Sequence, residues 1–201
     1  MNTTGFFLAQ HHIGEELLTA GWHARSIAVA SQPGSAWTLL DPSRRIKIRM
    51  NADLGMPLAE VATMQLPGNP RTEPLWRLTV HHAPAQPLLA SALAAPHAAD
   101  SGTGRNRRAI ARALQTAGMR ADRSRLLCAL SGYAVWHAPD HQDDGTRDEA
   151  VWTATRCTDP GGWRINTRAV SADADATIPA AVLTPLITAT TNQNTRTENT
   201  R

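Results

Sequence analysis

The chain has 201 residues, 42% of them hydrophobic and 18% charged, so a packed core is expected and wholesale disorder is excluded. The net charge of +3 is too small to indicate a nucleic-acid or membrane partner by itself. Lys47 is the single lysine among the 20 basic residues. An arginine bias of this kind is typical of a GC-rich genome, and that origin is favoured over a functional one.

No targeting or membrane signal is recognisable. The N-terminus lacks a basic region followed by a long apolar run, and no stretch approaches the ~18 apolar residues of a membrane span. Cys128 and Cys157 form no disulfide framework. The sequence therefore predicts a cytoplasmic protein with reduced thiols and no membrane partner.

The first predicted element is a helix over residues 8–20. Leu8, Ile13 and Leu17 recur at helical spacing, and Gly21 follows as a terminating residue.

Strands and a short helix follow in the first half. Ile46, Ile48 and Met50 alternate with basic residues, as on a half-buried strand. Residues 76–80 alternate in the same way, with Trp76 on the apolar side. A short helix is predicted over residues 88–93, opened by Pro87 and stopped by Pro96.

The second half predicts a similar series. A helix is expected over residues 106–117, with Ile110 and Leu114 on one face and Gly118 at its end. Residues 151–155 and 163–166 are candidate strands. Pro179 opens a last short helix, which Pro185 is expected to kink or end.

Three landmarks indicate an internal duplication. Gly21 is matched to Gly118 within similar tetrapeptides, and further landmarks match Trp37 to Trp136 and Trp76 to Trp163. These four tryptophans lie at the apolar positions of predicted strands and are therefore predicted to be buried.

The predicted fold class is therefore α+β, with two pseudo-repeated units that each read helix, antiparallel meander, short helix. The predicted boundaries are a first repeat over residues 1–97, a small polar linker over 98–104, a second repeat over 105–188 and a disordered tail over 189–201.

These landmarks resemble a family of actinobacterial proteins, the SPDY-type domain of unknown function, which occurs in tandem copies. The resemblance rests on Gly21-Trp22, on Trp37 leading into Asp41-Pro42, and on the later Trp76. Pro139-Asp140 would be the corresponding turn in the second copy. The resemblance implies tandem domains, and it carries no activity with it.

The candidate catalytic and metal-binding residues of the sequence have plainer interpretations. His12 and Glu16 would share a helix face, but two ligands without a third favour an exposed ion pair. The run from His137 to Asp144 is rich in ligand types, yet an acidic turn explains it better. No nucleophile elbow or phosphate loop is present. The sequence predicts no enzyme, no metal site and no cofactor.

Charge placement is the remaining functional signal. Guanidinium groups suit phosphate or carboxylate, so two basic clusters are candidate anion or nucleic-acid sites. The candidate residues are Arg45, Lys47 and Arg49 on a strand, and Arg105, Arg108 and Arg112 on a helix face opposite Ile110 and Leu114.

The predicted function is a non-enzymatic binding or interaction module with an unknown protein partner. The alternative is a nucleic-acid-associated accessory protein that uses the arginine-rich segment 105–125, and a metal-dependent enzyme is the third class. An acidic run over residues 140–149 offers a counterpart to the basic clusters, within the chain or in self-association. Whether the basic strand and the basic helix share one face of the molecule would separate these alternatives.

Overall fold

A computed structural model describes residues 3–26, 36–51, 58–63, 74–98, 102–121, 126–129, 132–137 and 162–191. In this part of the chain the protein is α+β, as predicted. Ten strands form one antiparallel sheet, and the helices lie against it.

The first half of the chain runs helix, five strands, helix. Its elements are α1 (Thr3–Thr19), β1 (His23–Ser26), β2 (Ala36–Leu40), β3 (Ile46–Asn51), β4 (Ala59–Thr63), β5 (Arg77–His82), α2 (Ala85–Ala94) and the short 3-10 helix η1 (Ala95–His97).

The second half follows the same order of elements. They are α3 (Thr103–Thr116), β6 (Arg120–Ala121), β7 (Leu126–Ala129), β8 (Gly132–His137), β9 (Gly162–Thr167), β10 (Ser171–Asp175) and α4 (Ala180–Thr191).

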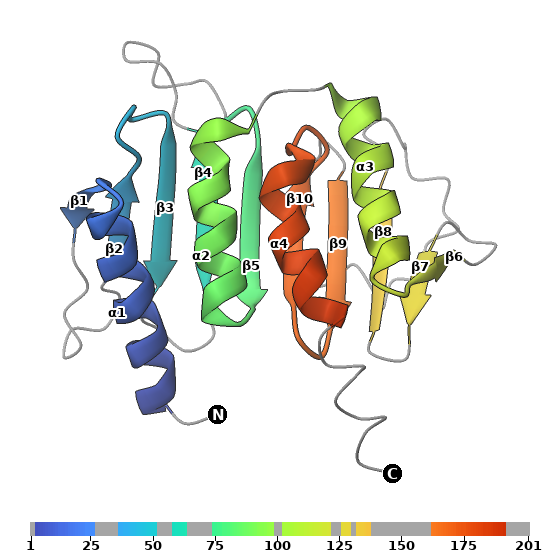
Figure 1. The fold of residues 1–201 in the computed structure, drawn as a ribbon, viewed down its shortest axis with the longest axis horizontal. Coiled ribbons are helices and arrows are strands. Elements are labelled where there is room, and N and C mark those ends of the chain that lie inside the picture. Colours follow the sequence, from blue (N-terminus) through green and yellow to red (C-terminus); the bar gives the residue numbers. More distant parts are fainter. Residues whose placement is uncertain are drawn as a thin grey trace, which may run out of the picture.

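The two halves share a single sheet rather than forming separate layers. Its strand order is β1-β2-β3-β4-β5-β10-β9-β8-β7-β6, so the last strand of each half meets at the centre (Figure 1). There β5 and β10 pair antiparallel, with Thr79 opposite Asp173. The predicted linker therefore separates two segments of sequence that are joined again by hydrogen bonds between strands.

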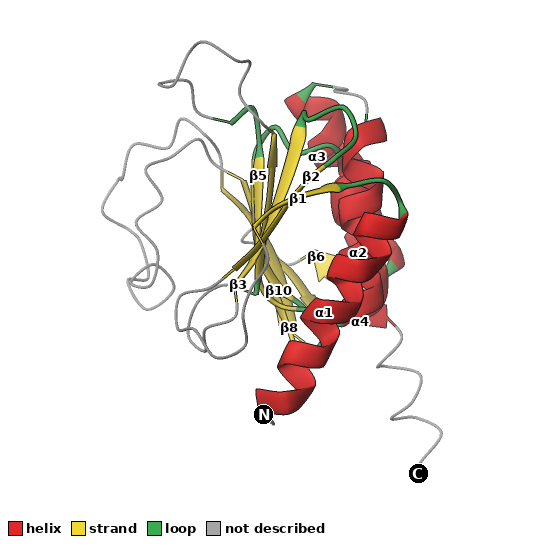
Figure 2. Ribbon diagram, turned by 90° about the vertical axis from the view of Figure 1, so that its left-hand side faces the viewer, coloured by secondary structure: helices red, strands yellow, loops and turns green. Residues whose placement is uncertain are grey.

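The helices cover one face of the sheet (Figure 2). Along this layer α1 contacts α2, α2 contacts α4, and α4 contacts α3. We call the other side of the sheet the open face, because no described helix lies on it. The buried side chains of both halves belong to one continuous hydrophobic cluster between helices and sheet.

Strand periodicity decides which side chains face the helices. Ile46, Ile48 and Met50 of β3 are buried, while Lys47 and Arg49 alternate with them, as predicted. The predicted strands at 76–80 and 163–166 correspond to β5 and β9. The candidate strand at 151–155 lies outside the described residues.

The buried tryptophans were predicted correctly. Trp37, Trp76, Trp136 and Trp163 are between 4% and 8% exposed, and all belong to the hydrophobic cluster. The Trp136 and Trp163 rings face each other across β8 and β9, with centroids 5.4 Å apart.

The ends of α1 and α3 are built alike, which confirms the two predicted glycine terminators. Gly21 and Gly118 have φ of 85° and 90°, a conformation that glycine adopts without steric cost. In α1 the Trp22 N–H donates to the Leu17 carbonyl at 3.0 Å, and the Gly21 N–H donates to the Leu18 carbonyl at 2.9 Å.

The equivalent bonds close α3. The Met119 N–H donates to the Leu114 carbonyl at 3.0 Å, and the Gly118 N–H donates to the Gln115 carbonyl at 2.9 Å. Both are Schellman caps, in which the residue after glycine packs on the last turn. Trp22 and Met119 are both buried.

The other two landmark matches are wrong as matches of elements. Trp37 lies on β2, the second strand of its half, whereas Trp136 lies on β8, the third strand of the other half. Trp76 directly precedes β5, whereas Trp163 lies on β9. Trp-Arg followed by an aliphatic residue recurs by chance on half-buried strands, because such strands select the same alternation.

The last helix is longer than predicted. Pro185 lies inside α4, which continues to Thr191. Proline removes one backbone hydrogen bond, but Leu186, Ile187 and Ala189 beyond it are buried, and this packing holds the last turns in place. The tail predicted from residue 189 is therefore helical as far as Thr191, and residues 192–201 lie outside the described part. No described helix is long and apolar enough to cross a membrane.

Candidate functional site on the open face

The open face presents a row of side chains that crosses seven strands. Each member is the direct cross-strand partner of the next, and each alternates with buried neighbours that face the helices. From β2 to β8 the row is Thr38, Arg49, Glu60, Thr79, Asp173, Arg164 and Val135. Side chains of opposite charge at directly paired positions attract each other, so the row also stabilises the sheet.

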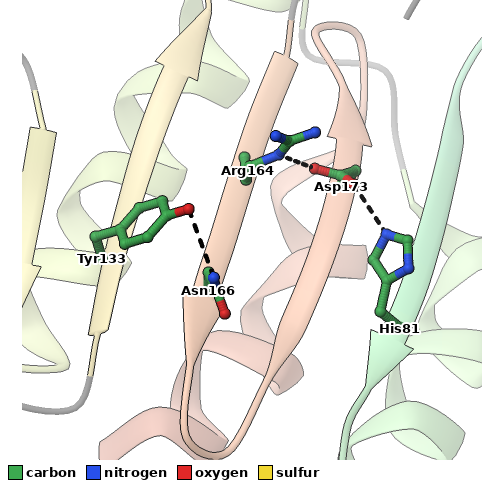
Figure 3. A network of polar contacts seen from close by, with 5 residues as sticks. All are labelled: His81, Tyr133, Arg164, Asn166 and Asp173. Carbon is green, nitrogen blue, oxygen red and sulfur yellow. Dashed lines mark hydrogen bonds and ion pairs between the residues drawn. The ribbon is translucent and has the colours of Figure 1, made fainter. Parts of the chain in front are cut away.

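The centre of this row is a polar network that joins the two halves (Figure 3). The Arg164 Nε donates to Asp173 Oδ1 at 2.7 Å, and the His81 Nε2 lies 2.9 Å from Asp173 Oδ2. His81 comes from β5 and Asp173 from β10, so the contact bridges the central junction. A weaker contact of 3.5 Å joins Asn166 Nδ2 to the Tyr133 hydroxyl.

Asp173 is held ionised by its partners. Burial acts to raise its pKa, but the hydrogen bonds from His81 and Arg164 outweigh that cost, and the net effect is a pKa below the usual range. Both oxygens of this carboxylate are engaged. The network is a structural clamp in its present geometry.

The first half of the open face is basic. Lys47 and Arg77 lie on either side of Ala62 in one cross-strand row, and Arg49 lies beside Glu60 in the next. Arg77 Nε pairs with Glu60 Oε1 at 3.6 Å. Among the described residues, Lys47 and Arg49 have no carboxylate within ion-pair distance.

A tight turn places the start of this basic cluster. The buried Asp41 carboxylate accepts the Ile46 N–H at 2.6 Å and the Ser43 N–H at 3.1 Å, which fixes the β2–β3 hairpin. Arg45 is exposed after this turn, and its Nε donates to Ser43 Oγ at 3.1 Å. The side chain of Arg45 is thus partly oriented by the turn.

The basic helix lies on the opposite side of the sheet. Arg105, Arg108 and Arg112 are exposed on α3, while Ile110 and Leu114 are buried, as the helical spacing predicted. Because α3 belongs to the helix layer, its arginines cannot act together with Lys47 and Arg49 on one surface. The two candidate clusters are separate.

Two further contacts have structural roles on the helix side. The Arg107 guanidinium stands 5.1 Å from the Trp136 ring centroid, which is a cation–π contact. His11 Nδ1 pairs with Glu15 Oε1 at 3.2 Å on α1. His12 and Glu16 are both exposed on the same helix.

Within the described ranges no group of three or more His, Cys, Asp or Glu side chains comes together. The acidic run 140–149, the part of the His137–Asp144 run that follows His137, and Cys157 lie outside those ranges.

Sequence reasoning missed the members of the central network. β10 reads Ser-Ala-Asp-Ala-Asp, and its alanines and aspartates have low strand propensity, so no strand was predicted there. The alternation of alanine with polar residues was the signal that could have indicated a half-buried strand. The His81 side chain is 39% exposed.

No protein-family model, no curated protein and no solved structure matches this chain.

Proposed function

We propose that this protein is a non-enzymatic module that binds another protein through the open face of its sheet. The observation that carries the proposal is the seven-strand row of exposed and half-exposed side chains, six of them polar, on a face without described helices. A broad sheet surface that carries both positive and negative side chains suits a partner with the complementary pattern, since such patterns set register and specificity.

A nucleic-acid partner is disfavoured on this face. A phosphate chain that followed the row would meet Glu60 and Asp173 near its centre. Proteins that bind single strands stack bases on exposed aromatic rings. Here the described tryptophans are buried under the helices, and Tyr133 is the one described aromatic residue on the open face.

The experiment is selection of binders from a random peptide library with the full chain, repeated with two variants. Thr79→Glu places a long negatively charged side chain in the middle of the row, and Thr116→Glu makes the same change at an exposed position of α3 as a matched control. We expect enriched peptides to bind the wild type and the Thr116→Glu variant and to lose binding to the Thr79→Glu variant. Absence of enrichment, or binding that is unchanged by Thr79→Glu, would contradict the proposal.

The alternative function, a nucleic-acid accessory protein, rests on the exposed arginines of α3. If Arg105, Arg108 and Arg112 contact phosphates, changing all three to alanine should reduce the salt slope of binding by about 2–3. Titration with random-sequence DNA and RNA at low salt tests this. No binding under these conditions removes the alternative.

We also infer that the two halves arose by duplication of one helix–meander–helix unit. The inference is supported by the matching element order, the symmetric strand order about β5 and β10, and the equivalent caps at Gly21 and Gly118. Tandem copies of the SPDY-type domain and a cytoplasmic location belong to the same proposal.

A further inference from the structure

We infer that the first half of the open face binds an extended acidic segment of the partner protein, anchored by one apolar side chain. This inference rests on the proposed function and names the partner's chemistry. The surface involved, here called the basic corner, consists of Lys47, Arg49, Arg77 and the neighbouring Leu75.

The charge balance of the basic corner favours an acidic partner. Its cations face a single carboxylate, Glu60, which already pairs with Arg77. Arg49 is exposed and Lys47 is half-buried, and neither has an ionic partner among the described residues. Two cations therefore remain available for carboxylates that arrive from outside.

Among the described residues, the second half of the open face offers no such pair. There Arg164 is only 16% exposed and is engaged by Asp173, which also holds His81. An acidic segment on that side would compete with an existing carboxylate. Charge complementarity thus selects the first half.

The spacing of the basic corner matches an extended chain. Lys47 and Arg49 are two residues apart on β3, so they project from the same face ~6.6–6.8 Å apart. Carboxylates at every second position of an extended peptide have the same spacing. Ala62 lies between Lys47 and Arg77 in the same cross-strand row and is 3% exposed, so the surface at this point is formed by the side chains around it.

Leu75 supplies the apolar contact. It is 79% exposed, the most exposed large hydrophobic side chain in the described residues, and it stands two positions before Arg77. Its backbone is fixed on both sides, because its N–H donates to Thr63 Oγ1 at 2.7 Å and its carbonyl accepts the Thr177 hydroxyl. Because its backbone is already fixed, Leu75 loses little conformational freedom when a partner covers its side chain, and burial of that apolar surface is favourable.

The test uses the full chain and a fluorescent peptide of about twelve residues, in which glutamate alternates with threonine around one central leucine. A peptide with glutamine in place of glutamate is the charge control, and a random single-stranded DNA of similar length is the competing polyanion. Lys47→Glu/Arg49→Glu removes the free cations. Arg108→Glu/Arg112→Glu changes the net charge by the same amount on the helix side.

We expect the glutamate peptide to bind the wild type and the Arg108→Glu/Arg112→Glu variant with affinities within ~2-fold, and the Lys47→Glu/Arg49→Glu variant at least ~10-fold more weakly. Leu75→Ser should weaken binding of the glutamate peptide but not of a version with serine in place of the central leucine, whereas Leu93→Ser, a change at an exposed leucine of α2, should have no effect. Circular dichroism of each variant checks that the fold is intact.

Three results would overturn the inference. The first is equal binding of the glutamate and glutamine peptides at low salt, and the second is equal loss in both double variants. The third is DNA that binds as tightly as the glutamate peptide and is lost in the Lys47→Glu/Arg49→Glu variant, which would assign the corner to polyanions in general. If library peptides are sensitive to Thr79→Glu but are not acidic, the proposed function stands and this inference alone fails.

Discussion

The two halves of the sheet share an order of elements but differ in the chemistry of their open faces. In the first half Lys47 and Arg49 have no described ionic partner, whereas in the second half Arg164 is tied to Asp173. The side facing the helices is similar in both, with buried aliphatic and tryptophan side chains. Packing constrains the side chains that face the helices, so the side chains of the open face can differ between the two halves.

The largest expected effect comes from a contact that only the second half has. The described strands of the first half contain no glycine, whereas β9 begins with Gly162, where a Cβ would lie 2.0 Å from the Ala174 carbonyl oxygen. Gly162→Ala should therefore cost more than ~4 kcal/mol, measured by urea unfolding. Gly104→Ala is the control, since nothing lies within 4 Å of its Cβ position, and it should change stability by at most ~1 kcal/mol.

Truncating a core tryptophan in each half tests whether their cores contribute equally. Trp76 and Trp163 are 6% and 4% exposed, so changing either to alanine should cost ~3–5 kcal/mol. Denaturant unfolding should give a single transition for both variants, because the halves share one hydrophobic cluster. A loss below ~1 kcal/mol in one half would mean that its tryptophan is not a core residue.

The helix caps provide the sharpest test of equivalence. Gly21→Ala and Gly118→Ala each force a Cβ into the left-handed region, and each should cost ~1–2 kcal/mol. Because both caps have the same hydrogen bonds, the two losses should agree within ~0.5 kcal/mol. Thermal unfolding of the two variants side by side measures this. Unequal losses of stability would show that the two caps are not equivalent and would weaken the case for duplication.

The central network predicts that the free energy of unfolding depends on pH. The pKa of Asp173 is lowered in the folded protein, so its stabilising contribution is fully present above the unfolded value of ~3.9 and is lost as the pH falls through the folded value. Asp173→Asn should cost ~0.2–1 kcal/mol at neutral pH, as for partly solvated ion pairs. The difference from wild type should vanish in strong acid. A constant difference from pH 7 to pH 2 would show that the charge contributes nothing.

The smallest effect is expected on the helix side. Arg105, Arg108 and Arg112 are exposed and point away from the core, so the triple change to alanine should alter the free energy of unfolding by less than ~0.5 kcal/mol. Equilibrium unfolding at low and high salt measures this. A larger loss that disappears at high salt would indicate an ionic contact of these arginines within the chain.

Much of the fold could be predicted because it depends on local periodicity. The alternation at Ile46, Ile48 and Met50 and the glycine terminators were sufficient to place β3 and the ends of α1 and α3. The pairing of β5 with β10 was not predictable, because a local sequence pattern does not specify which strand pairs with which. The clamp at Asp173 depends on that pairing, and so it was missed together with β10.

The central position of β5 and β10 has a consequence for synthesis on the ribosome. β5 ends at His82 and its partner β10 ends at Asp175. After β5 has been synthesised, 93 further residues must therefore be added before β10 is complete. At the usual rate of elongation that interval is about 5–20 s. An unpaired strand edge invites association with other chains, and charged side chains on it discourage this. Arg77, a charged side chain of β5, is therefore suited to discourage such association before β10 has been synthesised.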